Sequence, residues 1–361
     1  MLDPFFQRCL LRLAHLAARG KRRSADVARF MLDVDARVLV LARALSDGTY
    51  RPGLGRAFRL LDPKPRRIYA LPFVDRVAQH ALIDATLPAI ERRLADQTYA
   101  CRPGRGTHRA LRRASELARH RRFVLRVDVQ RFFPSVDHAI LRALLDRVTP
   151  PALRWLRDVF LDAPLPDGAV EPVAFHFPGD ELFTPLGRPH GLPIGSLTSQ
   201  IWANLHLAPL DHLLAAHLGL GGFVRYCDDI LVFDDDPGRL REAMARLHGR
   251  AAELRLRLHP DKTRLHRTSD PVSFIGFVLR RRGDAVNIRL RHDNVRRMRR
   301  RVGVLKAEFA AGGLPVAEVT QRLRAWLAHA AHGHTRALLE REHQAWVFRR
   351  GELGEADALD E

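Results

Sequence analysis

Three aspartates of this 361-residue chain stand among apolar residues of the kind that form β-strands. Asp128 lies near the end of the run 123–129, and Asp228 and Asp229 lie between two further runs of the same character. The pattern predicts a strand and a hairpin, with a carboxylate pair at the hairpin tip. Carboxylates that converge from separate strands repel one another unless a cation lies between them. Two magnesium ions bridging Asp128 and Asp228 would relieve that repulsion. Magnesium prefers oxygen ligands and usually completes its ligand shell with substrate phosphates, so the pattern predicts nucleotidyl-transfer chemistry.

The structural alternative is that the Asp pair only caps a turn through its own backbone. The strand-type runs 222–225 and 230–233 on either side of the pair, together with the separate carboxylate of Asp128, favour a metal site.

The sequence around these aspartates resembles the reverse transcriptase family. Tyr226-Cys227-Asp228-Asp229 is similar to the Tyr-x-Asp-Asp box of that family, and Asp128 with the Phe-Phe-Pro-Ser that follows it resembles the first catalytic motif. Further segments resemble other motifs in the same order, over roughly residues 50 to 280: the fingers segments 63–68 and 72–77, the loop 99–106 after them, the template-facing motif 191–200, the late palm motif 258–263 and the primer grip 273–277.

The resemblance implies an RNA-directed DNA polymerase that uses two Mg²⁺ ions, dNTP substrates, a template RNA and a DNA or RNA primer, and that makes cDNA. Asp128 and Asp228 would ligate both ions, and the backbone carbonyl of Val129 would add a ligand. Asp229 would be a weaker or more distant ligand. Lys262 would protonate the leaving pyrophosphate, and its alternative role is a plain surface charge.

Contacts to the nucleotide are also implied by the resemblance. Lys64 with Arg66 or Arg67 would hold the triphosphate, although an exposed surface role suits one of these arginines equally well. Phe133 would crowd a 2′ hydroxyl and so select dNTP over rNTP, and its alternative role is an ordinary core phenylalanine. Because adjacent residues of an extended chain point to opposite sides, Phe132 is expected to take the core position.

The template-facing motif departs from the common pattern of bacterial reverse transcriptases. Those enzymes read Gln-Gly-x-x-x-Ser-Pro, whereas this chain has Ile194-Gly195 and Ser199-Gln200. The Ile-Gly-x-x-x-Ser-Gln form resembles the enzymes of diversity-generating retroelements, which copy a template-repeat RNA with errors at adenines. Gly195 would let the backbone approach the template base, since it has no Cβ. Gln200 would contact the dNTP and Ile194 the template or primer, and both are expected to influence fidelity.

The primer grip would place Phe274 and Gly276 beside the primer strand. In the resembling systems a small basic oligomeric accessory protein also binds the polymerase, and this chain could alternatively act alone. Other functions fit parts of the pattern: a defence-associated, retron or group II intron-like reverse transcriptase, a catalytically silent RNA-binding maturase, or a generic two-metal phosphotransferase or nuclease.

Composition independently predicts a nucleic-acid partner. Sixty Lys and Arg against 41 Asp and Glu give a formal net charge of +19 and a pI of about 11.2. Such a charge attracts polyanions and makes their binding salt-dependent. A high-GC genome also raises arginine content, but the clusters 280–282 and 296–301 favour a function for the charge.

Cysteine usage and hydropathy predict a cytoplasmic protein. The number and spacing of the cysteines, Cys9, Cys101 and Cys227, indicate neither a set of disulfide bonds nor a zinc site. Cys227 is expected to pack as a small apolar residue. No run approaches the ~18 to 20 apolar residues of a membrane span, and no cleavable signal pattern is visible at the N-terminus. We therefore expect no membrane partner.

The alternation of strand and helix patterns predicts an α+β fold, a right-hand polymerase with an antiparallel palm sheet followed by a helical thumb. The expected domains are an N-terminal helical extension (1–50), fingers and palm (51–279), a basic thumb (280–350) and an acidic disordered tail (351–361). Expected helices span 4–19, 24–47, 74–95, 106–120, 137–147, 151–161, 196–216 and 237–256, with three more beyond 291; strands are expected at 123–129, on both sides of the Asp228 turn, and near 273–279 and 285–289, with a short hairpin within 164–193.

Overall fold

The structure is a computed structural model, and it describes residues 4–61, 65–166, 169–217 and 222–350. The expected acidic tail, 351–361, and the expected triphosphate contact Lys64 lie outside the described residues. In chain order the elements are α1 (Pro4–Ala17), α2 (Ala25–Met31), α3 (Val34–Ser46), β1 (Arg56–Leu60), β2 (Arg66–Ala70), α4 (Phe73–Glu91), α5 (Thr107–His120), β3 (Phe123–Asp128), α6 (Phe132–Ser135), α7 (His138–Asp146), η1 (Pro151–Leu153), α8 (Arg154–Leu161), α9 (Thr184–Gly187), α10 (Leu197–His212), η2 (Leu213–His217), β4 (Phe223–Tyr226), β5 (Asp229–Asp234), α11 (Pro237–Glu253), β6 (Arg264–Arg267), β7 (Val272–Phe274), β8 (Phe277–Arg282), β9 (Ala285–Leu290), α12 (His292–Ala310), α13 (Val316–Ala330) and α14 (Arg336–Gln344).

A four-stranded antiparallel sheet with the order β4-β5-β3-β6 lies at the centre of the molecule. Side chains alternate between its two faces, as the strand period requires. Leu125 and Val127 join the larger core, which includes apolar residues of α10 and α11. Val124 and Leu231 face the opposite way, into a second core with α5 and the strands β7, β8 and β9. The ends of β3 and β5 that carry the aspartates therefore lie between two packed layers.

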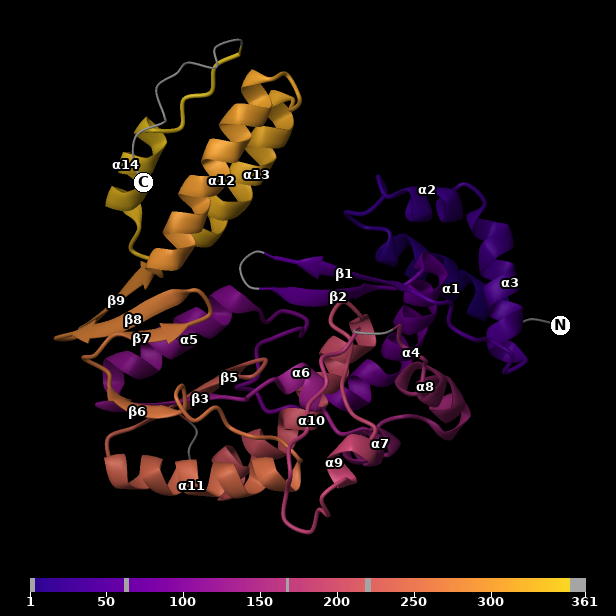
Figure 1. Cartoon of the computed structure of the whole chain (residues 1–361), viewed down its shortest axis with the longest axis horizontal. Coiled ribbons are helices and arrows are strands. Elements are labelled where there is room, and N and C mark those ends of the chain that lie inside the picture. The colour runs from indigo at the N-terminus through magenta and orange to yellow at the C-terminus, as the bar shows by residue number, and fades with distance from the viewer. Residues whose placement is uncertain (1–3, 62–64, 167–168, 218–221, 351–361) are drawn as a thin grey trace.

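The N-terminal helices pack on α4 at one end of the molecule, and the β1–β2 hairpin leads away from them toward the middle (Figure 1). The helix expected over 24–47 is wrong in one respect, because the chain breaks at Leu32-Asp33, where Asp33 has φ −133° and ψ 48°. The break lets both pieces contribute to the larger core. In α2, Phe30 packs edge-on against Phe73, with ring centroids 5.0 Å apart.

A second antiparallel sheet, β7-β8-β9, packs on α5 and leads into α12, α13 and α14 at the other end of the molecule (Figure 1). The single strand expected near 273–279 is wrong: Ile275 (φ 40°) and Gly276 (φ 89°) form a turn that separates β7 from β8. The hairpin expected within 164–193 is also absent from the described residues of that range, which hold α9 instead. Trp346 lies beyond the end of α14, with its ring 5.9 Å from that of Trp326.

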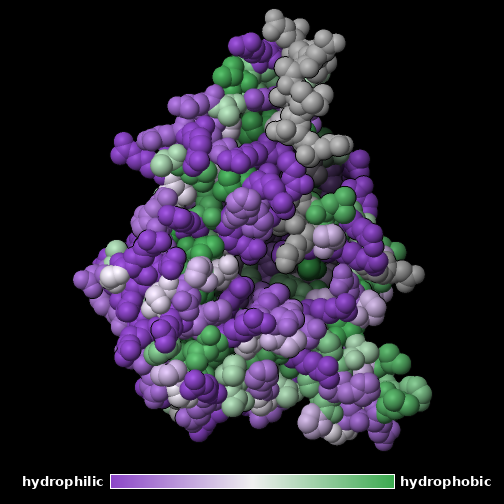
Figure 2. All heavy atoms as spheres, turned by 60° about the vertical axis from the view of Figure 1, so that its left-hand side comes forward, coloured by the Kyte–Doolittle hydropathy of each residue, from purple (hydrophilic) through white to green (hydrophobic). Residues whose placement is uncertain are grey.

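The chain thus combines helices with antiparallel sheets, which agrees with the predicted α+β class. Hydrophilic side chains cover most of the face seen in Figure 2, as the high charge content leads one to expect. Within the described part of the chain, none of the helices has the length and apolar composition needed to cross a membrane.

Candidate active site

The antiparallel register brings the aspartates of distant segments together. Strands β3 and β5 pair along their whole length, and Asp128 stands directly opposite Asp229. Opposed residues of an antiparallel pair have Cα atoms about 5 Å apart. The predicted meeting of the first catalytic motif with the Asp pair is therefore confirmed at the level of the backbone.

Asp228 lies in a two-residue turn between β4 and β5, where Tyr226 pairs with Asp229. The turn requires a left-handed residue, and Cys227 supplies it with φ 54°. That conformation is uncommon for a residue with a Cβ and is retained only where surrounding contacts fix it. The predicted hairpin with carboxylates at its tip is confirmed.

Two cations neutralise two of the three carboxylates. Lys262 Nζ donates to Asp128 Oδ1 at 2.9 Å, so its ammonium group lies beside a predicted metal ligand. Arg126 Nε donates to Asp229 Oδ1 at 3.4 Å. Arg126 was not identified in the sequence, although strand alternation gives the signal: it stands two residues before Asp128 and so points to the same face of β3.

Burial and repulsion by neighbouring carboxylates make Asp228 and Asp229 hard to ionise. Burial raises the pKa of Asp228, and the charge of Asp128 adds to that effect. Burial also raises the pKa of Asp229 to about 7, with further increases from Asp228 and Asp128 and an opposing decrease from Arg126. An added cation would favour the ionised form of each group.

A cavity of about 600 Å³ opens beside the turn. Its lining brings together most of the residues that the sequence predicted for nucleotide and template contacts. These are Arg66, Arg67, Phe133, Ile194, Gly195 and Gln200, together with Asp228 and Asp229. Phe132 takes the core position, as expected, at 3% exposure. The expected reason is wrong, because the two rings lie on the short helix α6 and not on an extended chain, and the half-buried Phe133 packs against the same core while it also lines the cavity.

Gly195 lies in close contact with the strand that carries the two arginines. Tyr69 of β2 donates its backbone N–H to the Ile194 carbonyl at 2.7 Å. Gly195 has φ 119°, and a Cβ at this position would lie 2.6 Å from the Tyr69 carbonyl oxygen. The glycine is therefore required by the approach of β2, a neighbour that the sequence did not identify.

The two predicted primer-grip residues lie away from the cavity lining. The side chain of Phe274 is buried at 1% exposure in the second core. Gly276 lies nearest His329 and Asn294. Between them, Ile275 reaches the cavity, and its left-handed φ of 40° was not visible in the sequence.

The donor set fits magnesium in its chemistry, since it consists of carboxylate oxygens whose repulsion a divalent cation would relieve. Val129, predicted to offer its carbonyl, is buried and lies opposite Leu258 in an isolated antiparallel bridge. Among the described residues, no three His, Cys, Asp or Glu side chains converge in the present geometry as a group that could hold a metal ion. Asp128 and Asp229 are instead turned toward Lys262 and Arg126.

The comparisons with known proteins agree with this geometry. A family model described as reverse transcriptase (RNA-dependent DNA polymerase) matches residues 62–279, which is more than half of the chain. The chain belongs to the reverse transcriptase family. Among curated proteins, none is similar enough in sequence to be matched with it. Family membership implies an RNA-directed DNA polymerase, a nucleotidyltransferase whose substrates are dNTPs and a template nucleic acid and which generally uses divalent ions such as Mg²⁺.

Proposed function

We propose that this reverse transcriptase synthesises DNA by two-metal nucleotidyl transfer at Asp128, Asp228 and Asp229. One observation carries the proposal: Asp128 pairs with Asp229 across β3 and β5, and Asp228 and Asp229 line a cavity that Arg66 and Arg67 also line. Two magnesium ions bound there would activate the primer 3′ hydroxyl as a nucleophile and would hold the triphosphate and the departing pyrophosphate.

The protein groups around this centre have separable roles in the proposal. Arg66 and Arg67 face the triphosphate, since guanidinium groups bind phosphate oxygens in pairs. Phe133 occupies the wall of the cavity where the sugar would lie, and selects deoxyribose by excluding a 2′ hydroxyl. Lys262 holds Asp128 before substrate binds and gives a proton to the leaving pyrophosphate afterwards.

The arrangement of elements supports a right-hand polymerase layout. In this proposal the β1–β2 hairpin belongs to the fingers, the sheet β4-β5-β3-β6 forms the palm, and α12, α13 and α14 form the thumb. The arginine cluster 296–301 lies on α12, where it would meet the backbone of the template–primer duplex.

We further propose that the enzyme is the error-prone polymerase of a diversity-generating retroelement. Ile194 and Gln200, the two unusual positions of the template-facing motif, both line the cavity. In this proposal they contact the incoming nucleotide as it pairs with the template base. A small basic accessory protein would be its partner in such a system.

Primer extension on an RNA template tests both proposals. The wild-type protein is expected to extend a primer with dNTPs only when Mg²⁺ is present, with errors concentrated opposite adenine. Ile194→Gln is expected to lower misincorporation opposite adenine. Identical error spectra in the two proteins would refute the subclass, whereas absence of any Mg²⁺-dependent extension would refute the polymerase mechanism itself.

A further inference from the structure

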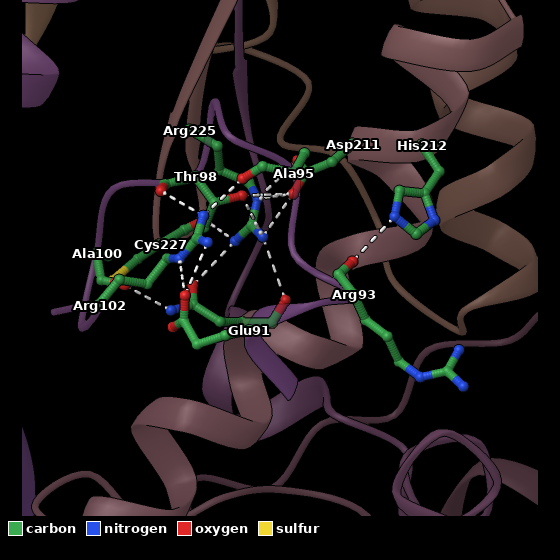
Figure 3. Close-up of polar contacts among 11 residues, drawn as sticks. Glu91, Arg93, Ala95, Thr98, Ala100, Arg102, Asp211, His212, Arg225 and Cys227 are labelled. Carbon is green, nitrogen blue, oxygen red and sulfur yellow. Dashed lines mark hydrogen bonds and ion pairs between the residues drawn. The ribbon is translucent and has the colours of Figure 1, made fainter. Parts of the chain in front are cut away.

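Arg225 is the penultimate residue of β4 and precedes the turn that carries Asp228. Its charged side chain is completely buried. Its Nε donates to the two carboxylate oxygens of Asp211 at 2.8 and 3.0 Å, and its Nη2 donates to Asp211 Oδ2 at 2.7 Å. Asp211 belongs to α10 and is also completely buried. Figure 3 shows the two side chains pointing toward one another, with Thr98 beside them.

The remaining donors of the guanidinium reach two other segments. Nη2 donates to the Thr98 hydroxyl at 3.1 Å, and that hydroxyl donates to Asp211 at 2.7 Å. Nη1 donates to the side-chain oxygen of Asn204 at 3.0 Å and to the backbone carbonyl of Cys227 at 3.2 Å. One side chain therefore joins α10, the loop after α4 and the catalytic turn.

The bond to Cys227 acts on a single peptide plane. The carbonyl of the Cys227–Asp228 peptide accepts from Arg225 Nη1. The orientation of this peptide is thus fixed at its carbonyl end. Because Cys227 is left-handed, the peptide would relax to another orientation if its carbonyl lost this partner.

We propose that Arg225 is a positioning residue that sets the direction of the Asp228 carboxylate through the Cys227–Asp228 peptide. The inference rests on the proposed metal-binding role of Asp228. A buried ion pair contributes little to stability beyond what apolar residues of the same volume would contribute, so stability alone does not explain this one. Its hydrogen bond to the turn gives it a further role, comparable to partners that orient metal ligands in other proteins.

Arg225→Lys tests the inference. A lysine keeps the charge opposite Asp211, but its single ammonium lacks the planar fork that reaches Asp211 and the Cys227 carbonyl together. Binding of Mn²⁺ alone, measured by electron paramagnetic resonance, is expected to weaken about tenfold. The Mg²⁺ concentration that gives half-maximal primer extension is expected to rise by a similar factor, after normalisation to the active fraction.

Arg157→Lys is the matched control. Arg157 in α8 is also buried and pairs with Asp146 and Asp158, but it does not line the cavity. This variant is expected to lower the unfolding temperature and to leave both metal midpoints unchanged, because it alters stability without touching the turn.

The outcomes separate the inference from the proposed function. Unchanged metal midpoints in Arg225→Lys, in a protein whose wild type extends primers, overturn the inference alone. A wild type that neither binds Mn²⁺ nor extends primers overturns both. Should Arg225→Lys fail to fold, the isosteric Thr98→Val removes the hydroxyl between Asp211 and the guanidinium; it is expected to shift the midpoints in the same direction by less, and no shift overturns the inference.

Discussion

Replacing Gly195 by alanine should displace the strand that carries Arg66 and Arg67. The added Cβ would lie 2.6 Å from the Tyr69 carbonyl oxygen and 3.2 Å from Ile68 Cγ2, and the first of these atoms is backbone that cannot turn aside. At φ 119° the alanine is also strained, which costs about 1 to 3 kcal/mol. Overpacking adds about 1 to 3 kcal/mol, so the expected loss of unfolding free energy is roughly 3 kcal/mol or more.

Gly48→Ala separates backbone strain from the contact with β2. Gly48 also has a positive φ, 67°, but nothing lies within 4 Å of an added Cβ, so only strain of about 1 to 2 kcal/mol is expected. The measurements are urea unfolding and the KM for dNTP in primer extension. Gly195→Ala should be the less stable variant and should raise the KM, while Gly48→Ala leaves the KM unchanged. Equal destabilisation of the two variants with equal KM values would refute the close approach of β2 to Gly195.

Two further predictions concern pH and sugar selection. His206 is completely buried, and burial lowers its pKa to about 4, below the unfolded value of about 6.5. The unfolded state therefore binds the proton more tightly, so stability should fall as the pH drops below about 6.5 and level off near 4, by about 3 kcal/mol in total. His206→Gln should remove that part of the dependence in urea titrations, and a difference between the two proteins that does not vary with pH would contradict it. Phe133→Ala should lower the preference for dNTP over rNTP by about tenfold or more, and an unchanged ratio in single-nucleotide extension would return Phe133 to a packing role.

The central sheet could be predicted because most of its strands are recognisable from the local sequence pattern. The runs around Asp128 and the Asp228 turn combine β-branched residues with a turn signal, and their register follows from burying one face. Strand β6, Arg264–Arg267, could not be predicted in this way, because its residues Arg-Leu-His-Arg show no apolar alternation. It becomes a strand through pairing with β3, where Leu125 stands opposite Leu265.

The residues of the candidate site that belong to a sequence motif could be predicted. Those that act through a contact with another residue were harder to predict. The aspartates, Phe133 and Ile194 were identified from motifs; the structure places Asp228, Asp229, Phe133 and Ile194 around one cavity and pairs Asp128 with Asp229. The contacts of Arg126 with Asp229 and of Arg225 with Asp211 depend on which segments meet in space. The sequence alone does not specify such partners, because each contact joins two different elements; strand alternation shows only that Arg126 lies on the same face of β3 as Asp128.

The catalytic role of Asp228 is tested most directly by Mg²⁺-dependent primer extension by Asp228→Asn, with RNA binding measured on the same preparation. Asparagine keeps the size of the side chain but removes the charge that would hold the metal ions, so synthesis should fall about a thousandfold or more, equivalent to about 4 kcal/mol of transition-state stabilisation. RNA binding and the unfolding midpoint should change little. Asp235→Asn, which removes an exposed carboxylate paired with Arg121, should extend primers like the wild type. Undiminished synthesis by Asp228→Asn would contradict the assignment of this turn as the catalytic centre.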